Sequence, residues 1–294
     1  MAREHDPRPE EGFVDGVLLG TLSQWSSQDT CRPWTIATES GCIDVLFPDP
    51  NLVHTILSQP LRPARFTLLR WHDLDGGNPS WVLARMQWLA SYTAIDFLPP
   101  DMCPVPQVLE RAKKLIGRIE AYALCNFMRA VLADRTIHAN FWTMPASARH
   151  HHAQPGGLAL HSVEVAEDMA AQGQLTDTER DLGIAAGFLH DIGKVWSYTG
   201  DMFLSAEGMS MGHELAGLCH LELHLRDLES QWSDGAFAMR VLLSGYSRQR
   251  AEGSMPMALL ARVRACDQRS CERSLGASKR PGRSWIPQPY ALPF

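Results

Sequence analysis

Histidine and aspartate side chains gather between residues 141 and 194 in a pattern that could bind divalent metal ions. Three consecutive histidines occupy positions 150–152, His161 follows them, and a His190-Asp191 pair lies near the end of the stretch. Imidazole binds zinc, iron, manganese and similar cations, and a carboxylate can bridge two of them. These residue types therefore indicate most of a metal-dependent hydrolytic site.

Two helices are expected to position these ligands. Apolar residues recur at helical spacing from His161 onward, which predicts one helix. A second helix is expected to begin at Thr178, with acidic residues in its first turn, and to carry His190-Asp191 in its last turn before Gly193. If the two helices are antiparallel, His161 lies beside His190-Asp191.

The set His161, His190-Asp191 and a distant aspartate resembles the ligand signature of the HD superfamily of metal-dependent phosphohydrolases. The distant aspartate would be Asp267, in the helical run ALLARVRACDQRS. The alternative is that these histidines are ordinary core or surface groups. That alternative is weak for a complete set in which HDIGK follows an apolar helix and GGLALHS precedes it.

Two branches of that superfamily are similar to this chain. The TraI-type conjugative relaxases resemble it locally, over PASARHHHAQPGGLALHSVEVA from Pro145 to Ala166. The YhaM-type 3′→5′ exoribonucleases, an OB-fold followed by an HD domain, resemble more of it. Their shared positions, in chain order, are Pro145, His151-His152, Gly157, His161, HDIGK, Glu207-Gly208, Gly212-His213, Leu243-Ser244, Gly253-Ser254 and Asp267.

The resemblance implies a metal-dependent phosphodiesterase or nuclease that acts on single-stranded RNA or DNA. His161, His190, Asp191 and Asp267 would hold one divalent metal, which could be manganese, iron, magnesium or zinc. The metal would lower the pKa of a bound water and polarise a phosphoryl oxygen. A DNA-processing component of conjugation, or a binding module with a degenerate site, are the alternatives from other classes.

Four further residues are expected to take part. Asp191 would bridge to a second metal, with His213 as its partner. Lys194 lies one turn past the ligands and could offset phosphate charge. His151 and His152 could contact the phosphate or protonate the leaving oxygen. The backbone at Gly156-Gly157 is expected to allow a close approach.

The second metal position departs from the YhaM pattern. Those enzymes carry an SHH triplet after the Leu-Ser pair, whereas this chain has Ser244-Gly245-Tyr246. Arg240 stands where a further family histidine is expected, and Arg248 and Arg250 follow, so fixed positive charge could hold phosphate there. We therefore expect one tightly bound metal, with a second ion recruited alongside the substrate.

The composition of the chain limits the classes of protein to which it could belong. The net charge of −6 and pI of about 6.0 argue against a strongly basic nucleic-acid binder. The seven cysteines include no CxxC motif, so we expect reduced thiols in a cytoplasmic protein. The polar start of the chain has no apolar signal core, and no run is long enough to span a membrane.

The expected fold class is α+β, with a small OB-like β-barrel before an all-α HD domain. Strands are expected around Val17-Leu18-Leu19, Trp34–Thr38, Ile43–Phe47, Phe66–Trp71 and Trp81–Trp88, with one helix over 51–59. The expected boundaries are a disordered lead at 1–11, the β domain at 12–98, the helical domain at 105–275 and a basic, Pro-rich tail at 276–294.

Three finer expectations concern particular segments. One long helix is predicted from about Gln107 to Ala133, after a Pro-rich linker. Another helix is expected to begin at His213, with its later histidines, His220 and His224, facing solvent. Tryptophans in the N-terminal part could stack on nucleic-acid bases, but core packing is the favoured interpretation; they are Trp25, Trp34, Trp71, Trp81 and Trp88.

Overall fold

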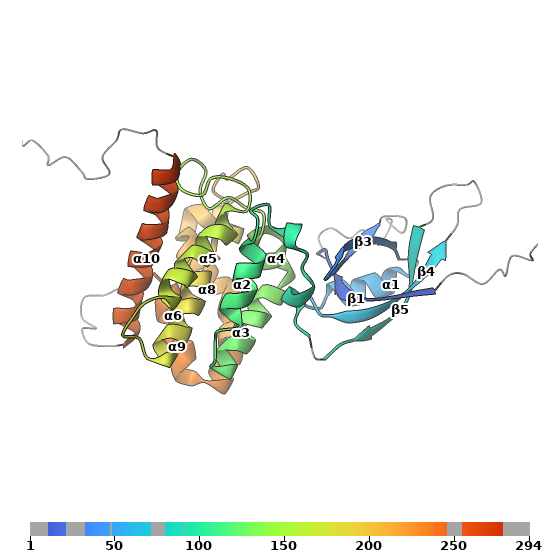
Figure 1. The fold of residues 1–294 in the computed structure, drawn as a ribbon, viewed down its shortest axis with the longest axis horizontal. Helices are drawn as coiled ribbons and strands as arrows, with labels where there is room; N and C mark the ends of the chain where they lie inside the picture. Colours follow the sequence, from blue (N-terminus) through green and yellow to red (C-terminus); the bar gives the residue numbers. More distant parts are fainter. Residues whose placement is uncertain are drawn as a thin grey trace, which may run out of the picture.

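The N-terminal part of the chain is a β-sheet and the C-terminal part is helical (Figure 1). The computed structural model describes residues 11–21, 33–47, 49–71, 80–90, 92–245 and 255–278. The predicted α+β class is therefore confirmed. The predicted lead and tail fall mostly on residues 1–10 and 279–294, which lie outside the described residues.

Five strands and one helix make up the described part of the N-terminal region. They are β1 (Glu11–Leu18), β2 (Trp34–Thr38), β3 (Gly41–Leu46), α1 (Pro50–Leu57), β4 (Ala64–Trp71) and β5 (Ser80–Trp88). The strand order is β1-β2-β3-β5-β4, and β1 also pairs with β4, so that the sheet closes on itself. The β3–β5 pairing is parallel and the others are antiparallel. The expected strands and the inserted helix are thus present.

Apolar side chains from alternate strand positions fill the interior of this sheet. Phe66, Ile36 and Leu18 are almost completely buried, and α1 covers them with Val53 and Ile56. The tryptophans follow the packing interpretation where the structure describes their side chains. Trp34 is in this core, and Trp81 and Trp88 pack against it.

Nine α-helices and two short 3₁₀ turns follow along the described chain. The turns are η2 (Ala94–Phe97) and η3 (Pro100–Met102). The helices are α2 (Val108–Ile116), α3 (Tyr122–Ala133), α4 (Arg135–Phe141), α5 (Gly157–Ala170), α6 (Asp177–Leu189), α7 (Lys194–Ser197), α8 (Ala206–Gln231), α9 (Ser233–Leu243) and α10 (Met255–Ser278); with α1 they make ten. α10 continues past the expected domain end at residue 275. No described helix is long and apolar enough to cross a membrane.

The prediction of one long helix over 107–133 is wrong, because this segment forms the separate helices α2 and α3. Gly117 ends α2. The buried carboxylate of Asp181, on α6, then accepts hydrogen bonds from the backbone N–H groups of Glu120 (2.9 Å) and Ala121 (2.8 Å). These bonds satisfy donors at the start of α3, as a side-chain cap does. The break is therefore held by a residue far along the chain.

Arg135, the first residue of α4, joins the sheet to the helices. Its buried guanidinium donates to four backbone carbonyls of the N-terminal part: Leu18 (2.8 Å), Gly20 (2.9 Å), Gln59 (2.7 Å) and Ile56 (3.3 Å). Burial lowers the pKa of Arg135 to about 10, so the group stays charged at neutral pH. Arg135 thus helps to fasten the two parts of the chain, together with a backbone hydrogen bond from Leu61 to Ala133 (2.7 Å) and a shared apolar core.

α8 contains a break at Gly212, whose φ of 74° is in the left-handed region. The helical stretch after it begins at His213, as the sequence predicted. Within it, His220 stacks on Trp196 at 4.2 Å and bonds Glu207, while His224 bonds Asp134. His220 is nevertheless exposed, as the sequence predicted, whereas His224 is half-buried.

Candidate metal centre

Four predicted ligands meet where α5, α6 and α10 pack together. His161 lies on α5, His190 caps the end of α6, Asp191 follows it, and Asp267 lies on α10. The Nε2 atom of His161 is 3.2 Å from Nε2 of His190, 3.1 Å from Oδ1 of Asp267 and 3.5 Å from Oδ2 of Asp191. The Nε2 atom of His190 is 3.5 Å from Asp191 and 3.8 Å from Asp267. The four side chains therefore aim one donor atom each at a common point.

The local sequence explains how α5 and α6 hold this arrangement. Thr176 and Glu179 form a capping box at the start of α6, so this helix begins at Asp177 rather than at Thr178. α5 begins at Gly157, a turn before the predicted start at His161. Gly187 of α6 lies against the Ala166 backbone of α5, where a Cβ would come within 3.1 Å of the Ala166 Cα. The small residue lets the two ligand-bearing helices approach closely.

The donor atoms fit a divalent metal in separation. Metal–nitrogen and metal–oxygen bonds of roughly 2.0–2.2 Å place neighbouring ligands about 3.0–3.4 Å apart. The separations in this cluster run from 3.1 to 3.8 Å. Small side-chain adjustments would bring all four atoms to bonding distance.

The protonation pattern of the two imidazoles points the same way. Nδ1 of His190 is 2.8 Å from the carbonyl oxygen of Gly187, so in the neutral ring it carries the proton and Nε2 has a lone pair. That lone pair, the Nε2 of His161 and two carboxylates face one another. A cation suits such a set of acceptors, so these residues fit a metal.

A buried hydrogen-bond chain orients His161. Its Nδ1 is 3.0 Å from Oγ of Ser270, whose hydroxyl donates at 2.6 Å to Oε2 of Glu164. Because the Ser270 proton is directed at Glu164, Nδ1 of His161 is the donor to Ser270 and Nε2 keeps its lone pair. Partners of this kind fix the orientation of a metal-binding imidazole and raise its basicity.

Sequence reasoning missed Glu164 and Ser270. Each lies three residues after a ligand on the same helix, Glu164 after His161 and Ser270 after Asp267, so helical spacing could have indicated both. His152 completes the chain, with its Nε2 3.2 Å from the same oxygen of Glu164. These contacts fall together only after α10 has packed on α5.

Both carboxylates of the cluster are ionised at neutral pH. Burial alone would raise the pKa of Asp191, but His190, Lys194 and a hydrogen bond from His213 hold it well below its usual range. The pKa of Asp267 is also lowered, because its interactions with His161 and His190 outweigh its burial. Two neighbouring negative charges, that of Asp191 buried and that of Asp267 partly exposed, favour a divalent cation.

Lys194 lies against Asp191 rather than facing the open side of the cluster. Its buried ammonium donates to Oδ2 of Asp191 at 2.6 Å and to the carbonyl oxygen of Ala146 at 2.9 Å. The amine therefore fixes the carboxylate and offsets its charge. This placement differs from the expected contact with a substrate phosphate.

His213 lies on the other side of Asp191, as expected for a partner of a bridging carboxylate. Its Nε2 is 3.0 Å from Oδ1 of Asp191, whereas Oδ2 of Asp191 faces the four-residue cluster. Gly245 lies near Glu214. Both line a pocket, together with His190, Asp191, His213, Arg264 and Asp267. The sequence did not indicate Glu214 or Arg264 at this position.

Arg240 does not add free positive charge to this pocket. Its guanidinium is bound by Glu222 at 3.1 Å and Glu229 at 2.9 Å, both on α8, and it is not among the lining residues. Tyr246, Arg248 and Arg250 lie outside the described residues. Arg264 is the cation that lines the pocket in the described part of the chain.

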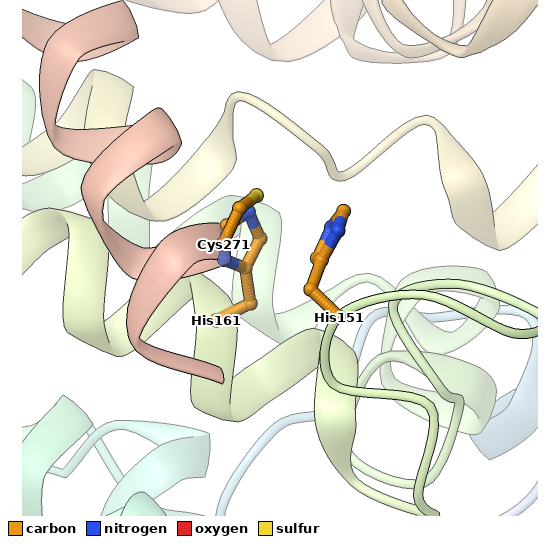
Figure 2. Close-up of side chains that lie close together, drawn as sticks. All are labelled: His151, His161 and Cys271. Atoms are coloured by element: carbon orange, nitrogen blue, oxygen red, sulfur yellow. The ribbon is translucent and has the colours of Figure 1, made fainter. Parts of the chain in front are cut away.

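His151, His161 and Cys271 form a second group beside the cluster (Figure 2). The rings of His151 and His161 are 5.1 Å apart, and Sγ of Cys271 is 3.5 Å from Oδ1 of Asp267. Burial, with His161 and Lys194 nearby, lowers the pKa of His151 to about 4. Burial and the Asp267 carboxylate raise the pKa of the Cys271 thiol to about 12.

Gly156 and Gly157 lie close to neighbouring parts of the chain. Gly156 is left-handed, with φ of 76°, and a Cβ on Gly157 would overlap the carbonyl oxygen of His152. These two residues thus seat the histidine loop directly on the start of α5.

Comparison with known proteins gives three curated relatives of the same kind. 3′-5′ exoribonuclease YhaM of Bacillus velezensis is 26% identical over 156 residues, which is 52% of this chain and 49% of the relative. The Listeria welshimeri protein of that name is 38% identical over 128 residues (42% and 40%), and the Bacillus subtilis protein 29% over 156 residues (52% and 49%). The chain resembles the YhaM-type exoribonucleases.

The extent of this resemblance is limited. The chain spans about half the length of the curated relatives it matches. No family model matches the chain. No solved structure matches it either.

Proposed function

We propose that this chain is a metal-dependent phosphodiesterase of the HD superfamily that hydrolyses single-stranded RNA. The observation that carries the proposal is the convergence of His161, His190, Asp191 and Asp267 on one point, with their donor atoms 3.1–3.8 Å apart. The resemblance to proteins named 3′-5′ exoribonuclease supports RNA as the substrate.

A divalent metal held by His161, His190, Asp191 and Asp267 would supply a water of lowered pKa and polarise a phosphoryl oxygen. The chain's own groups hold and orient the reactants. Lys194 fixes Asp191 and balances its charge. His151 is neutral at pH 7, since its pKa is about 4, so its ring N–H is suited to donate a hydrogen bond to a phosphate oxygen. His152 is a positioning residue, because its Nε2 is bound to Glu164.

We further propose one tightly bound metal per chain. Oδ1 of Asp191 and the ring of His213 could contact a second ion, with Glu214 beside them. No described residue supplies the paired histidines of the family pattern, since Gly245 occupies the first of their positions. A second ion would then be retained through substrate phosphate, and Arg264, which lines the same pocket, could share the phosphate charge.

The proposed domains are an OB-like barrel over residues 12–98 and an HD domain over 105–275. Support for the barrel comes from the closed strand order with a helix between β3 and β4. The barrel is proposed to hold the single-stranded chain while the helical domain cuts it.

Hydrolysis of three substrates side by side with manganese tests this function. We expect cleavage of single-stranded RNA by the wild type and by Asp227→Ala, which changes an exposed aspartate on α8. Asp191→Ala and Asp267→Asn should be inactive. Preference for single-stranded DNA would favour the relaxase-like alternative, and preference for a cyclic dinucleotide would contradict a nuclease. Metal binding without hydrolysis of any of the three would favour a binding module.

A further inference from the structure

Three side chains of types that can bind metal lie together next to the four-residue cluster. His151 comes from the loop before α5, His161 from α5 and Cys271 from α10 (Figure 2). One ligand atom of each lies within 4.8 Å of the other two. His161 is buried, whereas His151 and Cys271 are half-buried, so a cation can reach the group from solvent.

The spacing along α10 explains why Cys271 faces the metal centre. Asp267, Ser270 and Cys271 follow one another at helical spacings of three and four residues and therefore share one face of the helix. Ser270 contacts Nδ1 of His161, and Sγ of Cys271 contacts Asp267. The thiol is thus directed at the ligand cluster by the same face that supplies Asp267.

Two imidazoles and a thiolate form a soft ligand set. Zinc and cadmium-like cations favour sulfur and imidazole, whereas magnesium and manganese favour carboxylate and water. Bonds of roughly 2.0–2.3 Å from a cation to nitrogen and sulfur need ligand separations of about 3.5 Å. His151 on its loop and the Cys271 side chain on α10 can close the remaining distance by small rotations.

We propose that His151, His161 and Cys271 form a soft-metal site that excludes metal from the four-residue cluster. Both sites need His161, and its Nδ1 is committed to Ser270, so Nε2 is the one ligand atom that either site can use. A zinc or cadmium ion at this site takes His161 away from His190, Asp191 and Asp267. On binding, the Cys271 thiol forms a sulfur–metal bond and releases its proton to solvent.

The functional consequence rests on the proposed hydrolase. Zinc or cadmium should inhibit the manganese-loaded protein, because either ion removes one of the four ligands of the hydrolytic metal. The binding site itself does not rest on that function. Its detection needs no substrate, so the two ideas can fail separately.

Titration of the full chain with cadmium under reducing conditions tests the site. The readout is the ultraviolet charge-transfer absorbance of a cadmium–thiolate bond. We expect the wild type to develop this band with one equivalent of cadmium. The control variant Cys219→Ser, which changes an exposed cysteine on α8, should give the same band. Cys271→Ser should lose the band and bind cadmium more than about tenfold more weakly, since removal of even a hydrogen-bond partner of a ligand costs that much.

Two outcomes of that titration would overturn the site. One is the absence of the band from the wild type, which requires no variant to fold. The other is a band of wild-type size and midpoint in Cys271→Ser. His151→Asn provides an independent variant on the loop, and we expect its cadmium midpoint to rise as well.

Competition with manganese tests the sharing of His161. We expect manganese to be released, as followed by electron paramagnetic resonance, in step with growth of the cadmium–thiolate band. A band that develops while manganese stays bound would show that the two sites do not share a ligand. If the protein hydrolyses no nucleic acid, the proposed function fails, while the band and the manganese release still decide this inference.

Discussion

Removal of the Ser270 hydroxyl should weaken metal binding although Ser270 is not a ligand. In the wild type, Oγ of Ser270 accepts from Nδ1 of His161 and donates to Glu164. Ser270→Ala leaves that N–H without its acceptor in a place where both His161 and Ser270 are fully buried. The imidazole then loses both its orientation and part of its basicity.

Ser270→Ala should change two quantities, the metal affinity and the folding free energy of the metal-free protein. Loss of such an outer partner lowers metal affinity by roughly 10- to 100-fold, or about 1.4–2.7 kcal/mol. A buried donor left unpaired also costs the metal-free protein about 1–3 kcal/mol of folding free energy. Equilibrium dialysis with manganese measures the first quantity, and urea unfolding after metal removal measures the second.

A matched control separates this effect from a general loss of serine. Ser230 lies on the exposed surface of α8, and its hydroxyl donates to the backbone of its own helix. Ser230→Ala should bind manganese as the wild type does. A folded Ser270→Ala protein with wild-type manganese affinity would refute the orienting role of the Glu164–Ser270 chain.

Three further predictions concern the scaffold. Arg135→Met leaves four carbonyls without their donor and should lower the free energy of unfolding in urea by at least about 2 kcal/mol. Proteolytic cleavage between residues 97 and 107 should also become faster. If neither value changes, Arg135 does not fasten the sheet to the helices. Burial, with Arg135 nearby, lowers the pKa of His138 to about 4. Below about pH 6.5 the unfolded state therefore binds a proton at His138 that the folded state does not bind. The free energy of unfolding in urea should fall by up to about 3 kcal/mol as the pH drops from 6.5 to 4. In His138→Phe the dependence of this free energy on pH should be weaker. Asp181→Asn should lower the free energy of unfolding by about 1–2 kcal/mol, because it weakens the cap at the start of α3. A thermal midpoint equal to that of the wild type would contradict this capping role.

The local pattern of the chain was enough to predict most of its secondary structure. Alternating apolar residues gave the strands, and helical spacing gave the helices that carry His161 and His190. The break between α2 and α3 could not be read this way, because apolar spacing continues across it. The carboxylate that holds the break comes from Asp181, and nothing in the residues near Gly117 indicates that partner.

The proposed ligands of the candidate site were predictable from the sequence, whereas the residues that orient them were not. His161, His190, Asp191 and Asp267 match a known spacing, so the sequence indicated them together. Ser270 and Glu164 are ordinary polar residues until α10 packs against α5. The role of Lys194 also depends on packing, because its amine could reach either a substrate or Asp191, and the fold directs it to Asp191.

Metal content after gel filtration tests the central claim most directly. Protein purified without added metal and then saturated with manganese should retain one equivalent per chain, and Asp267→Asn should retain almost none. Asp227→Ala should match the wild type. Retention of a full equivalent by Asp267→Asn would contradict the four-residue centre, and two equivalents in the wild type would contradict the single tight site.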